Sequence, residues 1–175
     1  RHPEQIQGIA YMEAMVWPRH WTDMPPERVD MFKWLRTPEG EREALDKNIF
    51  AESMLFDKGI IRELSELEKE VYRYSTNRPG GTKLPGVMMP NDIPFDGDPA
   101  DTHKLVKFYA DWLAETDMPK LFIKADEGHG LAGAARDYAR TFKNQTEVTV
   151  SGTHFVQEDS PDEIGQAIAQ WYSNL

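Results

Sequence analysis

Two short apolar runs separated by a helical pattern constrain the fold of this chain more than any other feature. The runs Lys120–Ala125 (KLFIKA) and 146–150 (TEVTV) have the partly β-branched character of strands that helices cover. Between them, residues 131–142 place apolar side chains on one helix face: Ala134, Ala135, Tyr138 and Phe142. A strand, a helix and a strand in this order form a crossover unit with parallel strands. The sequence therefore predicts an α/β fold, and the run 7–12 (QGIAYM) adds a third strand.

Helix-start signals lie on both sides of this unit. The final helix is expected to begin at Pro161, with Ser160 as its N-cap and Glu163 completing a capping box. Asp98-Pro99 opens another helix by the same pattern. Its inward face is expected to carry the large apolar residues Leu105, Phe108, Tyr109, Trp112 and Leu113. These elements form half of a doubly wound sheet.

The stretch after the first strand has a different composition. Residues 17–94 contain charged helical pieces with Trp and Met, and two of them begin at the capping signals Thr37-Pro38-Glu39 and Ser65-Glu66-Leu67-Glu68. Pro and Gly cluster at 78–94, which predicts an irregular loop. Because the insertion is too long for a connection, we expect a helical lid. The expected division is a core strand with its loop at 1–16, a helical cap at 17–94 and the C-terminal part of the core at 95–175.

Composition excludes several classes of function. The 175 residues carry a net charge of -10, so no basic surface for nucleic acid or an anionic membrane is expected. Cys is absent and the five His lack the spacing of a metal site, so neither a metal nor a cofactor is expected. No apolar run is long enough to span a bilayer, and the first residues do not resemble a signal peptide. Localisation stays open between the cytoplasm and the periplasm.

Three ionisable side chains follow the three apolar runs, one after each: Glu13, Asp126 and His154. The carboxyl edge of a parallel sheet is where open α/β folds hold their sites. His154 is therefore a candidate general base, and either carboxylate could accept a hydrogen bond from its ring and fix its tautomer. The segment 127–130 (EGHG) matches no phosphate-binding motif and is interpreted as a turn.

Several segments resemble the haloalkane dehalogenases, in the same order along the chain. They are 8–14 (GIAYMEA), 48–52 (NIFAE), 93–94 (IP), 119–123 (PKLFI) and 152–165 (GTHFVQEDSPDEIG). The resemblance extends over essentially all 175 residues, and these motifs are long and specific. It implies an α/β-hydrolase fold, of which this chain is the C-terminal half, with three parallel strands, flanking helices and a helical cap insertion.

The resemblance also implies a reaction. In that family an Asp displaces halide from the carbon of a haloalkane, and a water activated by His then hydrolyses the alkyl ester. His154 corresponds to the base and Glu13 to its acid partner, while Asp126 is the alternative acid. An uncharged substrate needs an apolar pocket, and removal of water makes a carboxylate nucleophile more reactive. The residues implied for this pocket are Phe50 and Phe155, with Met54 and Lys58 near its mouth.

The chain departs from the family pattern in one important respect. No Gly-x-Asp-x-Gly elbow occurs in it, so the nucleophile is expected in a missing N-terminal half, and the chain alone is expected to be inactive. The expected partners are a small apolar haloalkane, halide ion and that missing half. Self-association is also expected, because the strand at 7–12 would have a bare edge. Two alternatives stay open: a coelenterazine luciferase or other α/β-hydrolase, since luciferases share a similar His-Phe-x-Gln-Glu-Asp stretch, and a non-catalytic binding fragment.

Overall fold

The computed structural model describes residues 2–78 and 83–175, which fall into two compact units. The sheet unit comprises the chain up to Trp17 together with Leu105–Leu175, and the helical unit comprises Pro18–Lys104. The division expected from composition, with boundaries at 16/17 and 94/95, stays a prediction.

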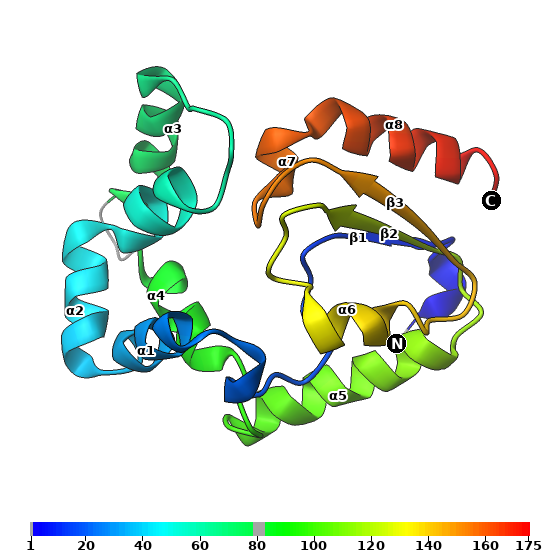
Figure 1. Ribbon diagram of the computed structural model, residues 1–175, viewed down its shortest axis with the longest axis horizontal. Helices are drawn as coiled ribbons and strands as arrows, with labels where there is room; N and C mark the ends of the chain where they lie inside the picture. The colour runs from blue at the N-terminus through cyan, green and yellow to red at the C-terminus, as the bar shows by residue number, and fades with distance from the viewer. Residues whose placement is uncertain (1, 79–82) are drawn as a thin grey trace. The chain divides into compact units, whose positions relative to one another are not determined.

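Three parallel strands form the centre of the sheet unit, in the order β1-β2-β3 (Figure 1). The strands are β1 (Ile9–Tyr11), β2 (Lys120–Ala125) and β3 (Gln145–Val150). They are accompanied by η1 (Pro3–Gln5), α6 (Gly133–Ala139), α7 (Val156–Asp159), α8 (Pro161–Tyr172) and α5 (Ala100–Glu115), of which the part from Leu105 onward belongs to this unit. Because α6 connects β2 to the parallel strand β3, the predicted crossover unit is confirmed.

Alternate residues of β2 belong to two different hydrophobic clusters. Leu121 and Ile123 pack in one cluster with Ile164 of α8. Phe122 packs in the other with Tyr11 and with residues of α5 and α6. Figure 1 shows α8 on one side of the strands and α5 and α6 on the other. Helices therefore cover both faces, which explains why β2 is an almost continuous apolar run.

Strand β1 lies at one edge of the three-stranded sheet. It is shorter than the predicted run 7–12, and it pairs with β2 through the register Ile9–Lys120. Among the described residues, no strand pairs with its other side. A free strand edge can template association. The expected self-association stays a prediction.

The helical unit is built from short helices. They are η2 (Trp21–Asp23), α1 (Pro26–Leu35), α2 (Pro38–Lys47), the π-helix η3 (Phe50–Asp57), α3 (Glu66–Thr76) and α4 (Leu84–Asp92). A cluster of Leu35, Ala44 and Val87 joins α1, α2 and α4. Helical pieces within 17–94 were expected from the sequence, and the structure shows them.

Both helix starts predicted for this unit are confirmed. The Thr37 hydroxyl accepts a hydrogen bond from the Gly40 N–H at 3.0 Å and caps α2. Ser65 and Glu68 form a capping box at the start of α3, where each side chain accepts the other residue's backbone N–H. Such caps satisfy donors that the first turn of a helix leaves unpaired, so they can be predicted locally.

The irregular loop predicted for 78–94 is wrong in part. Residues 79–82 lie outside the described residues, but Leu84–Asp92 form helix α4. Pro85 occupies the first turn, where a helix needs no N–H donor, so this proline is compatible with a helix start. Val87, 4% exposed, then anchors α4 in the core of the unit.

The capping box predicted for the final helix is also wrong. Helix α8 begins at Pro161 as expected, but the Ser160 side chain makes no capping hydrogen bond. Its hydroxyl instead donates to the Ser151 carbonyl at 2.7 Å. A tertiary acceptor therefore competes successfully with the local one, and Ser160 ties the start of α8 to the loop after β3.

Helix α5 buries a different face from the predicted one. Val106 and Ala110 are buried with Leu113, whereas Leu105 is 60% exposed and Phe108 is 72% exposed. The prediction of an inward position is wrong for Leu105 and Phe108. Apolar residues occupy a wider part of the α5 surface than the sheet covers. The smaller of these side chains lie on the covered part.

Lys120 is fully buried at the start of β2, with none of its surface exposed. Its ammonium group donates to three backbone carbonyl oxygens, those of Thr116 at 2.7 Å, Met118 at 2.9 Å and Lys143 at 2.8 Å. Burial lowers the pKa of Lys120 below its usual value. The three bonds tie the ends of α5, β2 and the β3 connection together.

Replacing Lys120 by Met is expected to lower the free energy of unfolding by about 3 kcal/mol, because three buried carbonyl groups lose their donor. The measurement is the urea midpoint of the chain. Lys124→Met is the matched control, since Lys124 lies on the same strand but is only half-buried, and it should change stability by less than ~0.5 kcal/mol. Equal losses in the two variants would contradict the proposed importance of the buried ammonium.

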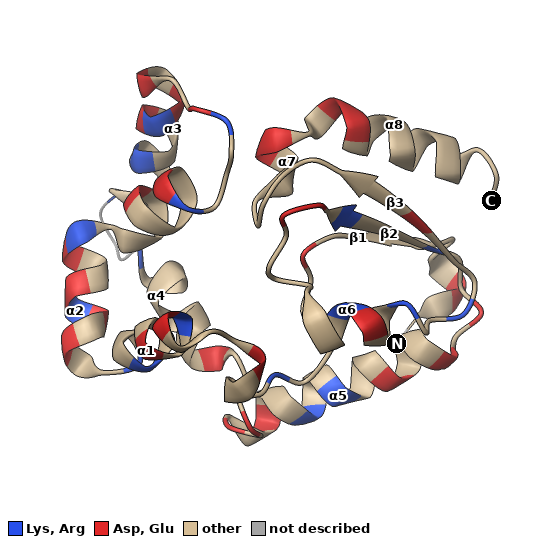
Figure 2. Cartoon of the chain, in the orientation of Figure 1, with Lys and Arg blue, Asp and Glu red and all other residues tan. Residues whose placement is uncertain are grey.

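Charged side chains of both signs are interspersed along the helices. Figure 2 shows Lys and Arg among Asp and Glu on α2, α3 and α5. Some form pairs one helical turn apart: Lys47–Glu43, Lys69–Glu66 and Lys107–Asp111. Pairs of this kind contribute little individually to stability. Across residues 2–78 and 83–175, no helix combines the length and the apolar character needed to cross a membrane.

Candidate active site

Three loops meet at the carboxyl edge of the sheet in the sheet unit. The loop after β1 carries Glu13, the loop after β2 spans residues 126–132, and the loop after β3 carries His154. Parallel strands bring their carboxyl ends to one edge, so residues more than 100 positions apart in the chain become neighbours.

Glu13 and His154 form a hydrogen-bonded pair. The Nδ1 atom of His154 lies 3.1 Å from the Oε2 atom of Glu13. The side chain of Glu13 is only 6% exposed, whereas that of His154 is 38% exposed. A carboxylate on Nδ1 favours the tautomer with its proton on that nitrogen, which leaves Nε2 as the basic atom. Nε2 has no hydrogen-bond partner among the described residues.

The backbone of Glu13 itself is unusual. Its φ is 43°, in the left-handed region that residues other than Gly rarely adopt. This conformation turns the chain sharply after β1 and brings the carboxylate to the loop 126–132. Backbone strain of this type is concentrated at functional sites.

Three backbone N–H groups of the loop 126–132 converge on the Glu13 carboxylate. Those of His129 and Gly130 donate to Oε2 at 3.0 and 2.5 Å, and that of Leu131 donates to Oε1 at 3.3 Å. Successive N–H groups that point into one concavity form an anion-binding nest. We call this loop the carboxylate nest. It holds Glu13 by backbone atoms alone.

The nest requires glycine at two positions. A Cβ atom at Gly130 would lie 2.8 Å from the Glu13 carboxylate and 2.8 Å from the His154 ring. A Cβ atom at Gly128 would lie 2.3 Å from Glu13 Oε1. From its sequence this segment was expected to be only a turn, and its role in holding Glu13 was not predicted. The Gly-His-Gly pattern directly after a strand was the available signal.

The environment of Glu13 lowers its pKa. Burial alone would raise the pKa, but the hydrogen bonds from His154 and from the Gly130 N–H outweigh it. The carboxylate is therefore charged at neutral pH. Because the folded pKa is below the unfolded value of about 4.3, this group stabilises the fold above that pH. The contribution is lost as the pH falls through the folded pKa.

Asp126 has different partners. Its Oδ1 atom accepts the N–H of Gly152 at 2.8 Å and that of Glu127 at 2.9 Å. The Gly152 N–H is the main cause of a lowered pKa at Asp126. This carboxylate therefore ties the loop after β2 to the loop that carries His154. The hydrogen bond of the His154 ring goes to Glu13.

Sequence comparison finds relatives over the whole chain, although no protein-family model matches it. A haloalkane dehalogenase of Sphingobium indicum is 47% identical over 175 residues, which are 100% of this chain and 59% of that protein. One from Mycolicibacterium smegmatis is 43% identical over 177 residues, covering 100% of this chain and 56% of that protein. The chain thus spans somewhat more than half the length of these relatives.

Solved structures agree with the sequence comparison. The haloalkane dehalogenase from Bradyrhizobium elkani matches with a TM-score of 0.90 and 32% identity, covering 98% of this chain and 60% of that one. The whole chain is thus homologous to a part of haloalkane dehalogenases. The α/β-hydrolase fold expected from the resemblance is confirmed, and the luciferase and binding-fragment alternatives are not favoured.

Four residues were expected to line a haloalkane pocket, and the two units divide them. Phe155 directly follows His154, and their rings meet edge to face with centroids 5.0 Å apart. Phe50 and Met54 lie in η3, and Lys58 is the C-cap residue of that helix. In the same unit, a Cβ atom at Gly86 would lie 3.2 Å from Phe50, so α4 packs closely on this ring. A pocket formed by these four residues stays a prediction.

The described part of the chain, without residues 1 and 79–82, contains no group of three or more His, Asp and Glu side chains that could hold a metal ion. The charged groups at the carboxyl edge are instead engaged with backbone donors and with each other. The arrangement that this edge provides is a histidine with a buried carboxylate behind it, which is an arrangement suited to proton transfer.

Proposed function

We propose that this chain supplies the base and its acid partner to a haloalkane dehalogenase, with His154 as the base and Glu13 as the acid. The observation that carries the proposal is the Nδ1–Oε2 hydrogen bond of 3.1 Å, made to a carboxylate that three backbone N–H groups already hold. This arrangement orients the imidazole and stabilises the imidazolium that forms when His154 accepts a proton.

The proposed reaction has two steps. In the first, a carboxylate oxygen of an Asp outside this chain attacks the carbon that bears the halogen, and halide leaves with the electron pair of the carbon–halogen bond. In the second, His154 Nε2 takes a proton from water while the water oxygen attacks the carbonyl carbon of the alkyl ester. The alcohol leaves, the Asp is regenerated, and the proton is released from His154. The net products are alcohol, halide and a proton.

The roles of the remaining predicted residues follow from this reaction. Phe50 and Phe155 are proposed to line an apolar substrate pocket, with Met54 and Lys58 near its mouth. Such a pocket concentrates an uncharged haloalkane and keeps the nucleophile desolvated. No Gly-x-Asp-x-Gly motif occurs in the 175 residues, so the chain alone is proposed to be inactive.

The test supplies the part that this chain lacks relative to the Sphingobium indicum relative. The segment of that relative which the chain does not match is fused to the chain, and we call the product the joined protein. Halide release from a panel of chloro- and bromoalkanes is measured for the joined protein and for each part. The joined protein should turn over, and each part alone should not.

Two outcomes would overturn the proposal. One is a joined protein with a cooperative thermal transition that releases no halide from any member of the panel. The other is turnover by the 175-residue chain alone. His2→Phe serves as the matched control in the joined protein, because His2 is an exposed histidine hydrogen-bonded to Glu4, and its replacement should leave the rate unchanged.

A further inference from the structure

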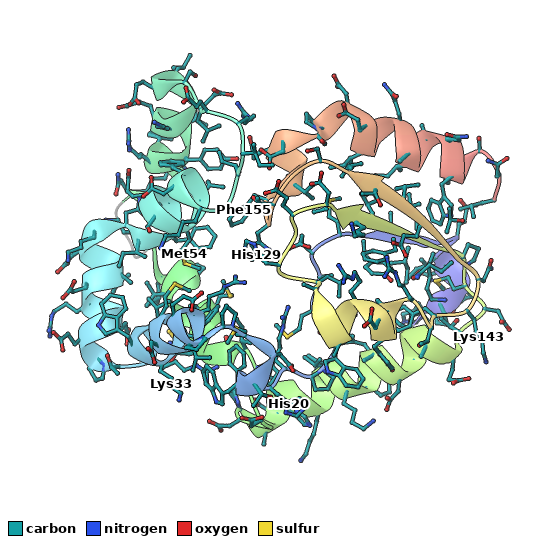
Figure 3. All side chains as sticks on the ribbon, in the orientation of Figure 1. His20, Lys33, Met54, His129, Lys143 and Phe155 are labelled. Atoms are coloured by element: carbon teal, nitrogen blue, oxygen red, sulfur yellow. The ribbon has the colours of Figure 1, made fainter. Side chains whose placement is uncertain are left out.

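His129 contacts both members of the pair proposed to be catalytic. Its backbone N–H donates to Glu13 Oε2 at 3.0 Å. Its ring stacks on the ring of His154, with centroids 5.2 Å apart and planes inclined by 25°. Figure 3 labels His129, on the loop after β2, and Phe155, which follows β3; both belong to the sheet unit. One residue thus binds the acid through its backbone and contacts the base through its side chain.

The position of this imidazole follows from the construction of the carboxylate nest. The flanking residues Gly128 and Gly130 have no room for a Cβ atom, because Glu13 and His154 occupy that space. Position 129 is therefore the place between these two glycines where a side chain fits, and this chain has an aromatic ring there. The ring lies on the base rather than away from it.

Stacking supplies a restraint that the hydrogen bond to Glu13 does not. A single hydrogen bond at Nδ1 fixes the position of one atom of the His154 ring, but the ring plane can still tilt about that atom. Because 38% of this side chain is exposed, the surrounding residues do not enclose it fully. The His129 ring on the His154 plane and the Phe155 ring at 64° to it restrict that motion. Aromatic pairs in such geometries contribute about 0.5–1.5 kcal/mol beyond their buried area.

We propose that His129 is a positioning residue for the base, whose ring holds the His154 imidazole in the plane that keeps Nδ1 on Glu13 and Nε2 available. The role of His154 in turnover rests on the proposed function, but the positioning itself does not. His129 acts through ring contact, so another aromatic ring should replace it and a small side chain should not.

The first measurement reads the orientation of His154 without any reaction. With five histidines in the chain, ¹⁵N-histidine labelling gives few signals, and the ¹⁵N shifts of His154 report its tautomer. We expect His129→Ala and His129→Leu to reduce the population with the proton on Nδ1 and to broaden the His154 signals. His129→Phe should retain the His154 signals of the parent, and His2→Ala should leave those signals unchanged. Two variants, His129→Ala and His129→Leu, are used so that the test does not depend on the folding of only one of them.

The second measurement uses turnover by the joined protein. His129→Ala should lower kcat about tenfold with little change in KM, since a misplaced base slows ester hydrolysis and not substrate binding. His129→Phe should restore kcat. An unchanged His154 spectrum in both His129→Ala and His129→Leu would overturn the positioning role, whatever the halide assay shows. Absence of turnover in the parent joined protein would overturn the proposed function instead.

Discussion

Replacing His154 by Phe in the joined protein is expected to stop turnover after a single halide ion per active site. Displacement of halide needs only the carboxylate nucleophile, whereas hydrolysis of the ester needs a base to deprotonate water. The alkyl-enzyme should therefore accumulate. Intact-mass spectrometry after incubation with a bromoalkane should show one covalent adduct, and halide measurements should show a burst without a steady state.

The Phe substitution suits this experiment because the ring at position 154 packs on His129 and Phe155, and another ring preserves those contacts. His2→Phe is the control and should show turnover without adduct. Continued steady-state turnover by His154→Phe would place the base elsewhere. Unmodified protein with no halide burst would show that His154 is required before the ester forms, which contradicts the assigned step.

Glu13→Gln is expected to lower the steady-state rate about 10⁴-fold, by analogy with the loss when the Asp of a serine-protease triad becomes Asn. The structure supplies the reason. Gln retains the shape of Glu13 but loses the charge that stabilises the imidazolium. Its amide nitrogen would also face N–H donors of the carboxylate nest, because donors approach both carboxylate oxygens.

Asp126→Asn is the matched comparison, and it is expected to cost less than about tenfold because its side-chain oxygen can still accept the Gly152 N–H. Steady-state halide release at saturating substrate is measured for both variants of the joined protein. A near-normal Glu13→Gln beside an inactive Asp126→Asn would reverse the assignment of the acid. Equal moderate losses would mean that the two carboxylates share the role.

Local sequence signals predicted the elements that depend on neighbours along the chain. Thr37 and Ser65 cap their helices through residues three positions away, so their roles were visible in the sequence. The strands β2 and β3 were visible as apolar runs, and the crossover between them followed from general handedness and connection rules. The motifs around Glu13 and His154 likewise indicated the family, because they are long and contiguous.

The tertiary structure decided everything that depends on residues distant in the sequence. Ser160 had a local capping role available, yet its hydroxyl bonds the Ser151 carbonyl that folding brings near. Leu105 and Phe108 look like core residues on a helix wheel, but the sheet covers only the neighbouring face of α5. The carboxylate nest is the clearest case, since it joins Glu13 to backbone atoms 116 to 118 positions away. A backbone N–H donor cannot be recognised from the residue type that supplies it. The sequence therefore determined which side chains could perform the chemistry, and only the fold determined which groups hold them in place.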